Sequence, residues 1–273
     1  MTDIGIDVVM RFHDMRRIHE LDRAILSLAC QSFHDVRAIL VAQNMGANEH
    51  AKILSVMEKY TKEAFPNFSH KLVDAKVSPG DQRTLLLNIG LRHVTSRFVA
   101  FLDADDYVYE DCYEYLISEV IENKAAIAFG NIVVKDVLAT DQFVYNVDSR
   151  RNMFSGEDFD DLLVTNFCPI HSFVIDRQMV EKADLKFDER LVRLEDYDFL
   201  LRICSKYSAL FKTRSKFVGV YNWHLDGKNS VMVRTNAIDA AVVKANEDAW
   251  VQARRIIWRV KTDIRERLKK IAV

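Results

Sequence analysis

The sequence predicts an α/β protein with a mostly parallel central sheet and helices on both faces. Short runs of β-branched and other apolar residues alternate with stretches that carry apolar residues at helical spacing, up to about residue 102. Strands that are covered on both faces read as continuous apolar runs, so this alternation is typical of a parallel sheet. In addition, 49% of the 273 residues are apolar, enough for one large core or two smaller ones.

The first half contains four expected strands and three expected helices. The strands are expected at residues 4–10, 36–44, 70–77 and 97–103. The helices are expected at residues 19–33, 50–65 and 81–94. In open sheets of this kind, ligands bind beyond the carboxyl ends of the strands. We therefore expect the functional site in the loops that follow these strands.

The second half is less regular. Helices are expected at 113–125, 193–207 and 235–271, and strands at 126–137 and 216–224. Residues 169–183 suggest a strand that leads into a helix, and residues 139–152 an irregular polar excursion. Ser155 is the expected N-cap of a further helix, with Asp158 three positions on as a weak capping box.

Composition excludes several classes of protein. The net charge is −2, and basic residues cluster only near the C-terminus, without aromatic residues interleaved along a face. We therefore expect no nucleic-acid partner. The four cysteines are far apart, which suggests reduced thiols in a cytoplasmic protein. No stretch approaches 18 uncharged apolar residues, so we expect no membrane-spanning helix.

Clustered carboxylates follow the strand at 97–103. Asp103, Asp105 and Asp106 stand within four positions, as Asp-Ala-Asp-Asp. Like charges repel and are costly to desolvate at the edge of a core, so a cation is one explanation for them. Closely spaced aspartates suit Mg²⁺ or Mn²⁺, whose shell a diphosphate can complete. Alternatively, Asp105 or Asp106 caps a helix that starts near Tyr109.

Three blocks of sequence carry a resemblance to a known family. They are VVMRFHDMRRIHELDRAILSLACQSF, GDQRTLLLNIGLRHVTSRFVAFLDADD and FDERLVRLEDYDFLLRI. In this order and at these distances, the blocks resemble the glycosyltransferases of family 2, which have the GT-A fold. The resemblance covers about the first 230 residues. It implies an inverting enzyme that moves a sugar from a nucleotide donor to a hydroxyl of a glycan or lipid-linked acceptor, assisted by Mg²⁺ or Mn²⁺.

The resemblance also assigns roles by position. Asp196 matches the catalytic base of the family, and Asp105 matches the main metal ligand. His224 matches a histidine that several members place near the metal and the diphosphate. The residues expected to bind the nucleotide sugar are Arg11, Asn44, Arg83, Asp103 and Glu195.

Each of these roles has a structural alternative. The acids at Glu195, Asp196 and Asp198 complement the first turn of a helix. His224 follows a buried strand, and Arg83 lies on a helix, where a solvated charge is common. The second strand ends Ala42-Gln43-Asn44, where many members have acidic residues that hold the base of the nucleotide, so the donor base is left open.

The resemblance divides the chain at two points. Residues 1–232 would form the GT-A domain, with a nucleotide-sugar-binding half at 1–106 and an acceptor-side half at 107–232. Residues 233–273 would form a helical extension. Its apolar stripe beside a basic face is compatible with packing on the domain, contact with the inner face of a membrane, or a homodimer.

Two other functions stay open from the sequence. A non-catalytic relative that binds nucleotide sugars or glycans would retain the fold, and the altered Ala42-Gln43-Asn44 segment favours it. A nucleotidyltransferase also uses paired acids on Mg²⁺, but it would normally show a glycine-rich loop after the first strand, where this chain has Arg11-Phe12-His13-Asp14.

Overall fold

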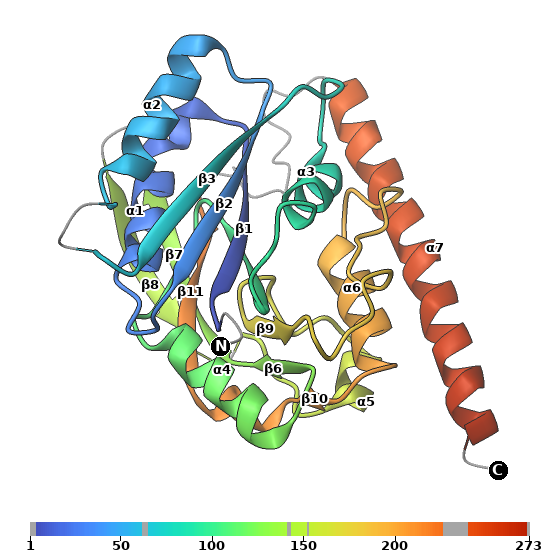
Figure 1. Ribbon diagram of the computed structural model, residues 1–273. Helices are drawn as coiled ribbons and strands as arrows, with labels where there is room; N and C mark the ends of the chain where they lie inside the picture. The colour runs from blue at the N-terminus through green and yellow to red at the C-terminus, as the bar shows by residue number, and fades with distance from the viewer. Residues whose placement is uncertain (1–3, 62–64, 141–142, 152, 226–239, 272–273) are drawn as a thin grey trace.

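The computed structural model describes residues 4–61, 65–140, 143–151, 153–225 and 240–271. Two sheets form its centre, and helices cover the larger one on both faces (Figure 1). The expected α/β class with a mostly parallel sheet and a long C-terminal helix is confirmed.

The larger sheet has seven strands in the order β10-β6-β9-β4-β1-β2-β3. Their bounds are β1 Ile6–Phe12, β2 Val36–Gln43, β3 Phe68–Ala75, β4 Phe98–Asp103, β6 Ile127–Phe129, β9 Phe173–Asp176 and β10 Ala209–Leu210. The pairs β1–β2, β1–β4, β2–β3 and β6–β10 are parallel, whereas β9 is antiparallel to both of its neighbours. The carboxyl ends of β1, β2 and β4 therefore meet at one edge of the sheet.

Helices pack on the two faces because side chains alternate along the strands. The α-helices are α1 Ile18–Ala29, α2 Ala47–Glu58, α3 Arg83–Leu91, α4 Cys112–Asn123, α5 Phe159–Leu162, α6 Glu195–Cys204 and α7 Ala240–Ile271. The 3₁₀ turns are η1 Met15–Arg17 and η2 Lys212–Ser215. Met10 of β1 joins the core under α1, α2 and α4, whereas the adjacent Val9 joins the core under α3 and α6.

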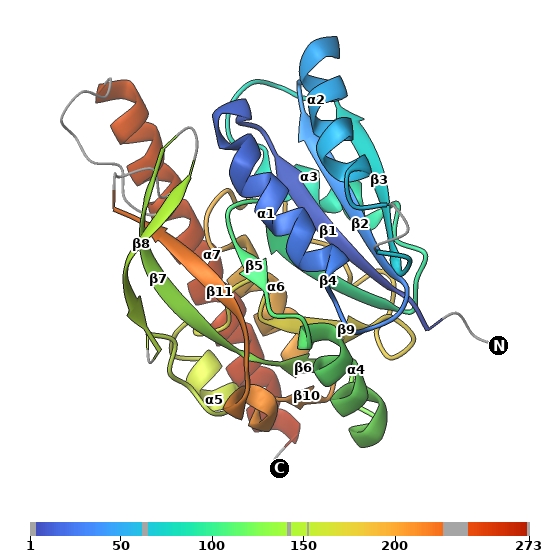
Figure 2. The same cartoon turned by 90° about the vertical axis from the view of Figure 1, so that its left-hand side faces the viewer.

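The smaller sheet has four strands in the order β5-β11-β7-β8. Their bounds are β5 Tyr107–Val108, β7 Asn131–Ala139, β8 Val144–Arg150 and β11 Phe217–His224. β11 runs parallel to β7, and β5 directly follows the aspartates at the end of β4. Figure 2 shows this sheet beside the larger one. Its position brings the end of β11 close to the carboxyl edge of the larger sheet.

The single strand expected at 126–137 is wrong, because β6 and β7 belong to different sheets. Gly130 separates them. A Cβ atom at this position would lie 2.2 Å from Cγ2 of Val218, far inside van der Waals contact. Only a glycine lets the backbone pass so close to β11 and cross from one sheet to the other.

Three local expectations are also corrected. Residues 144–150 form β8 instead of an irregular excursion; most of its side chains are exposed, so apolar alternation is weak there. The N-cap of α5 is Asp158, whose side chain accepts from the backbone N–H of Asp161, and not Ser155. Residues 177–183, directly after β9, form tight turns instead of the expected helix; the first turn begins at Asp176, which accepts from the N–H groups of Gln178 and Met179.

The inner face of α7 packs on the rest of the chain. Ala253, Ile257 and Ile264 are buried, and Nζ of Lys261 donates to the carbonyl of Val164 at 3.0 Å. Of the three arrangements considered for this helix, packing on the domain is thus confirmed. The part of the expected helix at 235–239 lies outside the described residues. Within the described chain, no helix is both long and apolar enough to cross a membrane.

Candidate active site

Two neighbouring strand ends supply the first charged group. Arg11 of β1 and Asp103 of β4 are register partners. The Arg11 guanidinium donates to both Asp103 oxygens, at 2.8 and 3.0 Å, and to Oε1 of Glu195 at 2.9 Å. Burial disfavours the charge of Asp103, but Arg11 overcomes it and holds the pKa of Asp103 below its usual value. Three residues far apart in the sequence thus form one ion-pair group.

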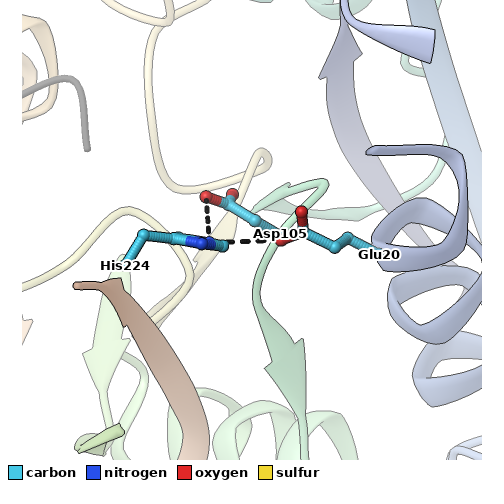
Figure 3. A group of neighbouring side chains, drawn as sticks. All are labelled: Glu20, Asp105 and His224. Carbon is cyan, nitrogen blue, oxygen red and sulfur yellow. Dashed lines mark ion pairs between the residues drawn. The ribbon is translucent and has the colours of Figure 1, made fainter. Parts of the chain in front are cut away.

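Asp105 belongs to a second charged group, with Glu20 of α1 and His224 at the end of β11 (Figure 3). Nε2 of His224 is 3.1 Å from Oε2 of Glu20 and 3.7 Å from Oδ2 of Asp105. Nη2 of Arg17 donates to Asp105 at 2.8 Å and to Glu20 at 2.9 Å, and lies 2.8 Å from Nε2 of His224. The two expected metal ligands, Asp105 and His224, are therefore neighbours.

The donor atoms of this group fit a divalent cation. One atom from each of Glu20, Asp105 and His224 lies within 4.8 Å of the others, and carboxylate with imidazole suits Mn²⁺. Burial disfavours the charge of Glu20, but hydrogen bonds from His224 and Arg17 lower its pKa to about 2. Arg17 neutralises the carboxylates in this structure, so a cation fits only if its side chain moves aside.

Asp106 and His171 form a buried pair behind these residues. Oδ2 of Asp106 is 3.4 Å from Nδ1 of His171, and the backbone N–H of Asn222 donates to Oδ1. Burial and the charge of Asp105 raise the pKa of Asp106 well above its usual value, and burial lowers that of His171 to about 4. The alternative role of Asp105 or Asp106 as the cap of a helix near Tyr109 is wrong, because the next helix, α4, begins only at Cys112.

A cavity of about 420 Å³ lies over the carboxyl edge of the sheet; we call it the larger cavity. Arg11, Arg17, Arg83 and Arg193 all contribute to its wall, together with the aspartates that follow β4. Asp81 binds two of these arginines, with Nη2 of Arg83 at 2.8 Å and Nη1 of Arg193 at 2.7 Å. Guanidinium groups suit the oxygens of a phosphate, so the wall can accept a diphosphate.

Asn44 does not line the larger cavity, whereas its neighbour Gln43 does. The backbone of Asn44 is left-handed, with φ 53°, and its side-chain amide is taken up by the backbone of Val77 at 2.9 and 3.0 Å. At this turn Gln43, and not Asn44, therefore lies in the wall of the larger cavity. A binding role for Asn44 itself stays a prediction.

An adjoining cavity of about 220 Å³, the smaller cavity, contains Asp196 and Asn166. Nδ2 of Asn166 donates to Oδ2 of Asp196 at 3.1 Å. Burial and the neighbouring charge of Glu195 raise the pKa of Asp196 to about 7. A carboxylate with this pKa is matched to proton removal near neutral pH.

The turn that presents these acids is strained. Leu194, directly before α6, has φ 59° and ψ 24°, a left-handed conformation that a leucine rarely adopts. Such strain persists only where the surrounding structure enforces it, and it concentrates at functional sites. Glu195 and Asp196 leave this turn toward Arg11 and the smaller cavity.

Several residues of the site were missed from the sequence. Those of the charged groups are Arg17, Glu20 and His171, and those of the cavities include Arg193, Tyr221, Trp223 and Trp250. One signal was available: the period of two along β11 places Tyr221 and Trp223 on the face opposite Asn222 and His224. No local pattern marks Glu20 as part of this group: Arg17 is a local partner, three positions earlier, but His224 comes from β11 and Asp105 from the turn after β4.

Comparison with known proteins identifies a family. A model described as glycosyl transferase family 2 matches residues 16–183. An uncharacterized glycosyltransferase of Haemophilus influenzae is 25% identical over 182 residues, which cover 66% of this chain and 65% of the relative. One of Rickettsia felis is 24% identical over 208 residues, covering 76% of this chain and 31% of the relative. The chain therefore spans less than two thirds of the length of either relative.

Solved structures share the fold at low sequence identity. S. aureus TarS 1-349 in complex with UDP-GlcNAc matches with a TM-score of 0.60 and 16% identity, over 80% of this chain and 58% of that one. The mannosyltransferase PcManGT from Pyrobaculum calidifontis, in complex with GDP-Man and Mn²⁺, matches with a TM-score of 0.53 and 14% identity, over 81% and 57%. These similarities confirm the GT-A fold.

Proposed function

Because the chain belongs to glycosyl transferase family 2, we propose that it transfers a sugar from a nucleoside-diphosphate donor to a hydroxyl group of a glycan or glycolipid. One observation carries the proposal: the larger cavity, rich in arginines, adjoins a smaller cavity that contains a carboxylate of raised pKa. Arg11, Arg83, Asp103, Arg193 and Tyr221 line both cavities. A donor and an acceptor bound in them would meet at this shared wall.

In the proposed reaction, Asp196 is the general base. The acceptor hydroxyl lies in the smaller cavity, and its oxygen attacks the anomeric carbon while its proton passes to the Asp196 carboxylate. The bond from the anomeric carbon to the diphosphate breaks, and its electron pair stays on the diphosphate. Attack from the side opposite the leaving group inverts the configuration at that carbon.

Arginines and acids of the larger cavity hold the donor in this proposal. Arg83 and Arg193 face the diphosphate, and Asp103 and Glu195 keep Arg11 in place beside it. Asp105, His224 and Glu20 would hold Mg²⁺ or Mn²⁺. Such a cation neutralises charge on the departing diphosphate. PcManGT, whose structure contains GDP-Man and Mn²⁺, supports a divalent ion by analogy.

Thermal unfolding with nucleotides tests the donor and the metal. We expect one of UDP, GDP, CMP or dTDP to raise the midpoint in the presence of Mn²⁺, by an amount equivalent to about 2.7 kcal/mol at one hundred times its dissociation constant. Asp105→Ala should abolish the part of this midpoint shift that depends on Mn²⁺. Asp160 is an exposed acid on α5, so Asp160→Ala should retain the full shift.

Other outcomes of these thermal unfolding measurements would change the proposed roles of the metal and the donor. A shift of equal size with and without Mn²⁺ would remove the metal from the proposal and leave Arg17 as the cation beside Asp105. No shift with any nucleotide would contradict the proposed function and favour a relative that no longer binds a donor.

The outer face of α7 suits an anionic membrane surface. Trp258 is 68% exposed, and the basic residues Arg255, Arg259 and Lys269 are exposed along the same helix. A tryptophan among basic residues binds at the interface of anionic lipid. We propose that the chain acts at the inner face of a cytoplasmic membrane on a lipid-linked acceptor.

Vesicle sedimentation tests this membrane contact. Wild type should bind vesicles that contain phosphatidylglycerol more tightly than vesicles of phosphatidylcholine alone. Arg255→Glu with Lys269→Glu should weaken binding to the anionic vesicles roughly 30-fold or more, since each basic residue near the surface contributes about 1 kcal/mol and each reversal also adds a repelled carboxylate. The same charge change outside α7, Lys52→Glu with Lys182→Glu, is the control. Equal weakening by both pairs would contradict a specific role for α7.

A further inference from the structure

The wall of the smaller cavity contains aromatic side chains as well as acids. Phe154, Tyr221, Trp223 and Trp250 line it, together with Asn166 and Asp196. Three of the aromatic residues contact one another: the Phe154 and Tyr221 rings are 6.0 Å apart, edge to face, and those of Tyr221 and Trp223 are 6.3 Å apart. The wall of the cavity therefore offers both aromatic surface and hydrogen-bonding groups.

The fourth aromatic residue, Trp250, comes from α7. Asn246, one turn earlier on the same helix, accepts from Nη2 of Arg193 at 2.8 Å, and Arg193 lines both cavities. Ala253, less than one turn after Trp250, is buried against the domain. These contacts fix residues 246–253 of α7 beside the cavity, so Trp250 is held there by the helix.

Rings with an apolar face and a polar rim match such a cavity. The C–H groups of a pyranose form an apolar face that stacks on indole or phenol rings, while its hydroxyls lie at the edge and reach hydrogen-bonding groups. The volume of the smaller cavity, about 220 Å³, lies below the range of about 300–1,000 Å³ found for pockets that bind drug-sized ligands. This volume limits the occupant to about one ring. The carboxyl groups of Glu195 and Asp196 line this cavity but not the larger one, so they disfavour an anionic ring here.

We infer that Trp223 and Trp250 stack on a neutral pyranose ring of the acceptor, so that α7 is part of the acceptor site. This inference rests on the proposed function and names its acceptor class. In this arrangement the aromatic residues hold the face of the ring, and Asn166 and Asp196 lie at its hydroxyl edge, where the reacting group must be.

Fluorine NMR tests the inference without enzyme activity. The chain has three tryptophans, so 5-fluorotryptophan gives three signals that single Trp→Phe variants assign. Trp258 lies on the same helix as Trp250 but is 68% exposed and does not line the smaller cavity, which makes it an internal control. Methyl glycosides of neutral hexoses would be titrated with and without saturating nucleotide and Mn²⁺.

We expect the signals of Trp223 and Trp250 to move together with one midpoint for at least one glycoside, while that of Trp258 stays in place. Trp250→Ala should weaken this binding about 10-fold, as followed at Trp223, whereas Trp258→Ala should leave it unchanged. A response at Trp223 alone, equal responses at all three, no response with any glycoside, or stronger responses to short-chain alcohols than to glycosides would overturn the inference.

Nucleotide binding separates this test from that of the proposed function. Trp250 does not line the larger cavity, so Trp250→Ala should keep the nucleotide-dependent thermal shift of wild type. That result also shows that the variant is folded. If wild type binds a nucleotide and Trp250 does not respond to any glycoside, only the acceptor inference fails; if no nucleotide binds, the proposed function fails first.

Discussion

Replacing Asp196 with asparagine is expected to lower kcat/KM for sugar transfer by about 10²–10⁴, the usual contribution of a positioned base. The change keeps the size of the side chain, and the amide oxygen can still accept from Nδ2 of Asn166, although the amide NH₂ then replaces the oxygen that accepts from the N–H of Tyr197. The amide cannot accept the proton of the acceptor. Donor binding should be retained, because Asp196 does not line the larger cavity. Steady-state kinetics and nucleotide thermal shifts measured on the same sample check both parts.

The pH profile of wild type should report the same group. Since the pKa of Asp196 is raised to about 7, its reactive ionised form is the minority at pH 6 and dominates at pH 8. The rate is therefore expected to rise through about pH 7. Asp198→Asn is the control: this residue is bonded to Arg202 at 2.9 Å and lines neither cavity, so its loss should leave the midpoint of the profile unchanged. An unchanged profile in Asp196→Asn would remove Asp196 as the base.

The stability of the Asp196→Asn variant above pH 7 should rise, whereas its activity should fall. A carboxyl whose pKa is raised on folding stabilises the native state most at low pH, below its unfolded value of 3.8, and loses that contribution as pH rises through about 7. An asparagine cannot ionise and does not suffer this loss. Above pH 7 the variant should thus be more stable than wild type, by on the order of 1 kcal/mol or about 2–4 °C in midpoint. The gain should fade toward pH 4.

Replacing Arg11 with methionine is expected to destabilise the fold by about 3–5 kcal/mol, the usual result of removing one partner from a buried ion pair. Arg11 lies between Asp103 and Glu195, and its side chain is only 12% exposed. Without it, Asp103 and Glu195 would lose the cation that hydrogen-bonds to both, and the remaining Arg83 lies farther away, with Nη1 4.0 Å from Oε1 of Glu195. Arg16→Met is the matched control: its side chain is 84% exposed and pairs with Asp14, so the change should stay within about 0.5 kcal/mol.

Urea unfolding at several pH values checks this result. Asp103 has a pKa lowered by Arg11, so its contribution is present above its unfolded value of 3.8 and is lost as pH falls through the folded value. The difference in free energy of unfolding between wild type and Arg11→Met should therefore become smaller below about pH 4. Similar losses in Arg11→Met and Arg16→Met would show that the ion-pair group contributes no more than a surface pair.

Much of the site could be predicted because it is local in the sequence. Asp103 and Asp105 follow an apolar strand, and Glu195 and Asp196 open a helix, so both acidic clusters can be seen without a structure. Even the pairing of Arg11 with Asp103 follows from two strands that end at the same edge of a parallel sheet. By contrast, the strand at 126–137 was mispredicted, because nothing local marks the crossing at Gly130 between two sheets.

The sequence alone determined the class of the fold, its first three helices and four strands, and the acids at their ends, since hydrophobic period and strand-end polarity are local properties. Tertiary structure decided which residues contact those acids and line the cavities beside them. Arg17 and Glu20 reach Asp105 only because α1 packs on the sheet beside β5, and Trp250 reaches the smaller cavity only because the buried stripe of α7 docks on the domain. Contacts between elements far apart in the chain depend on packing and burial, which no short window of sequence contains.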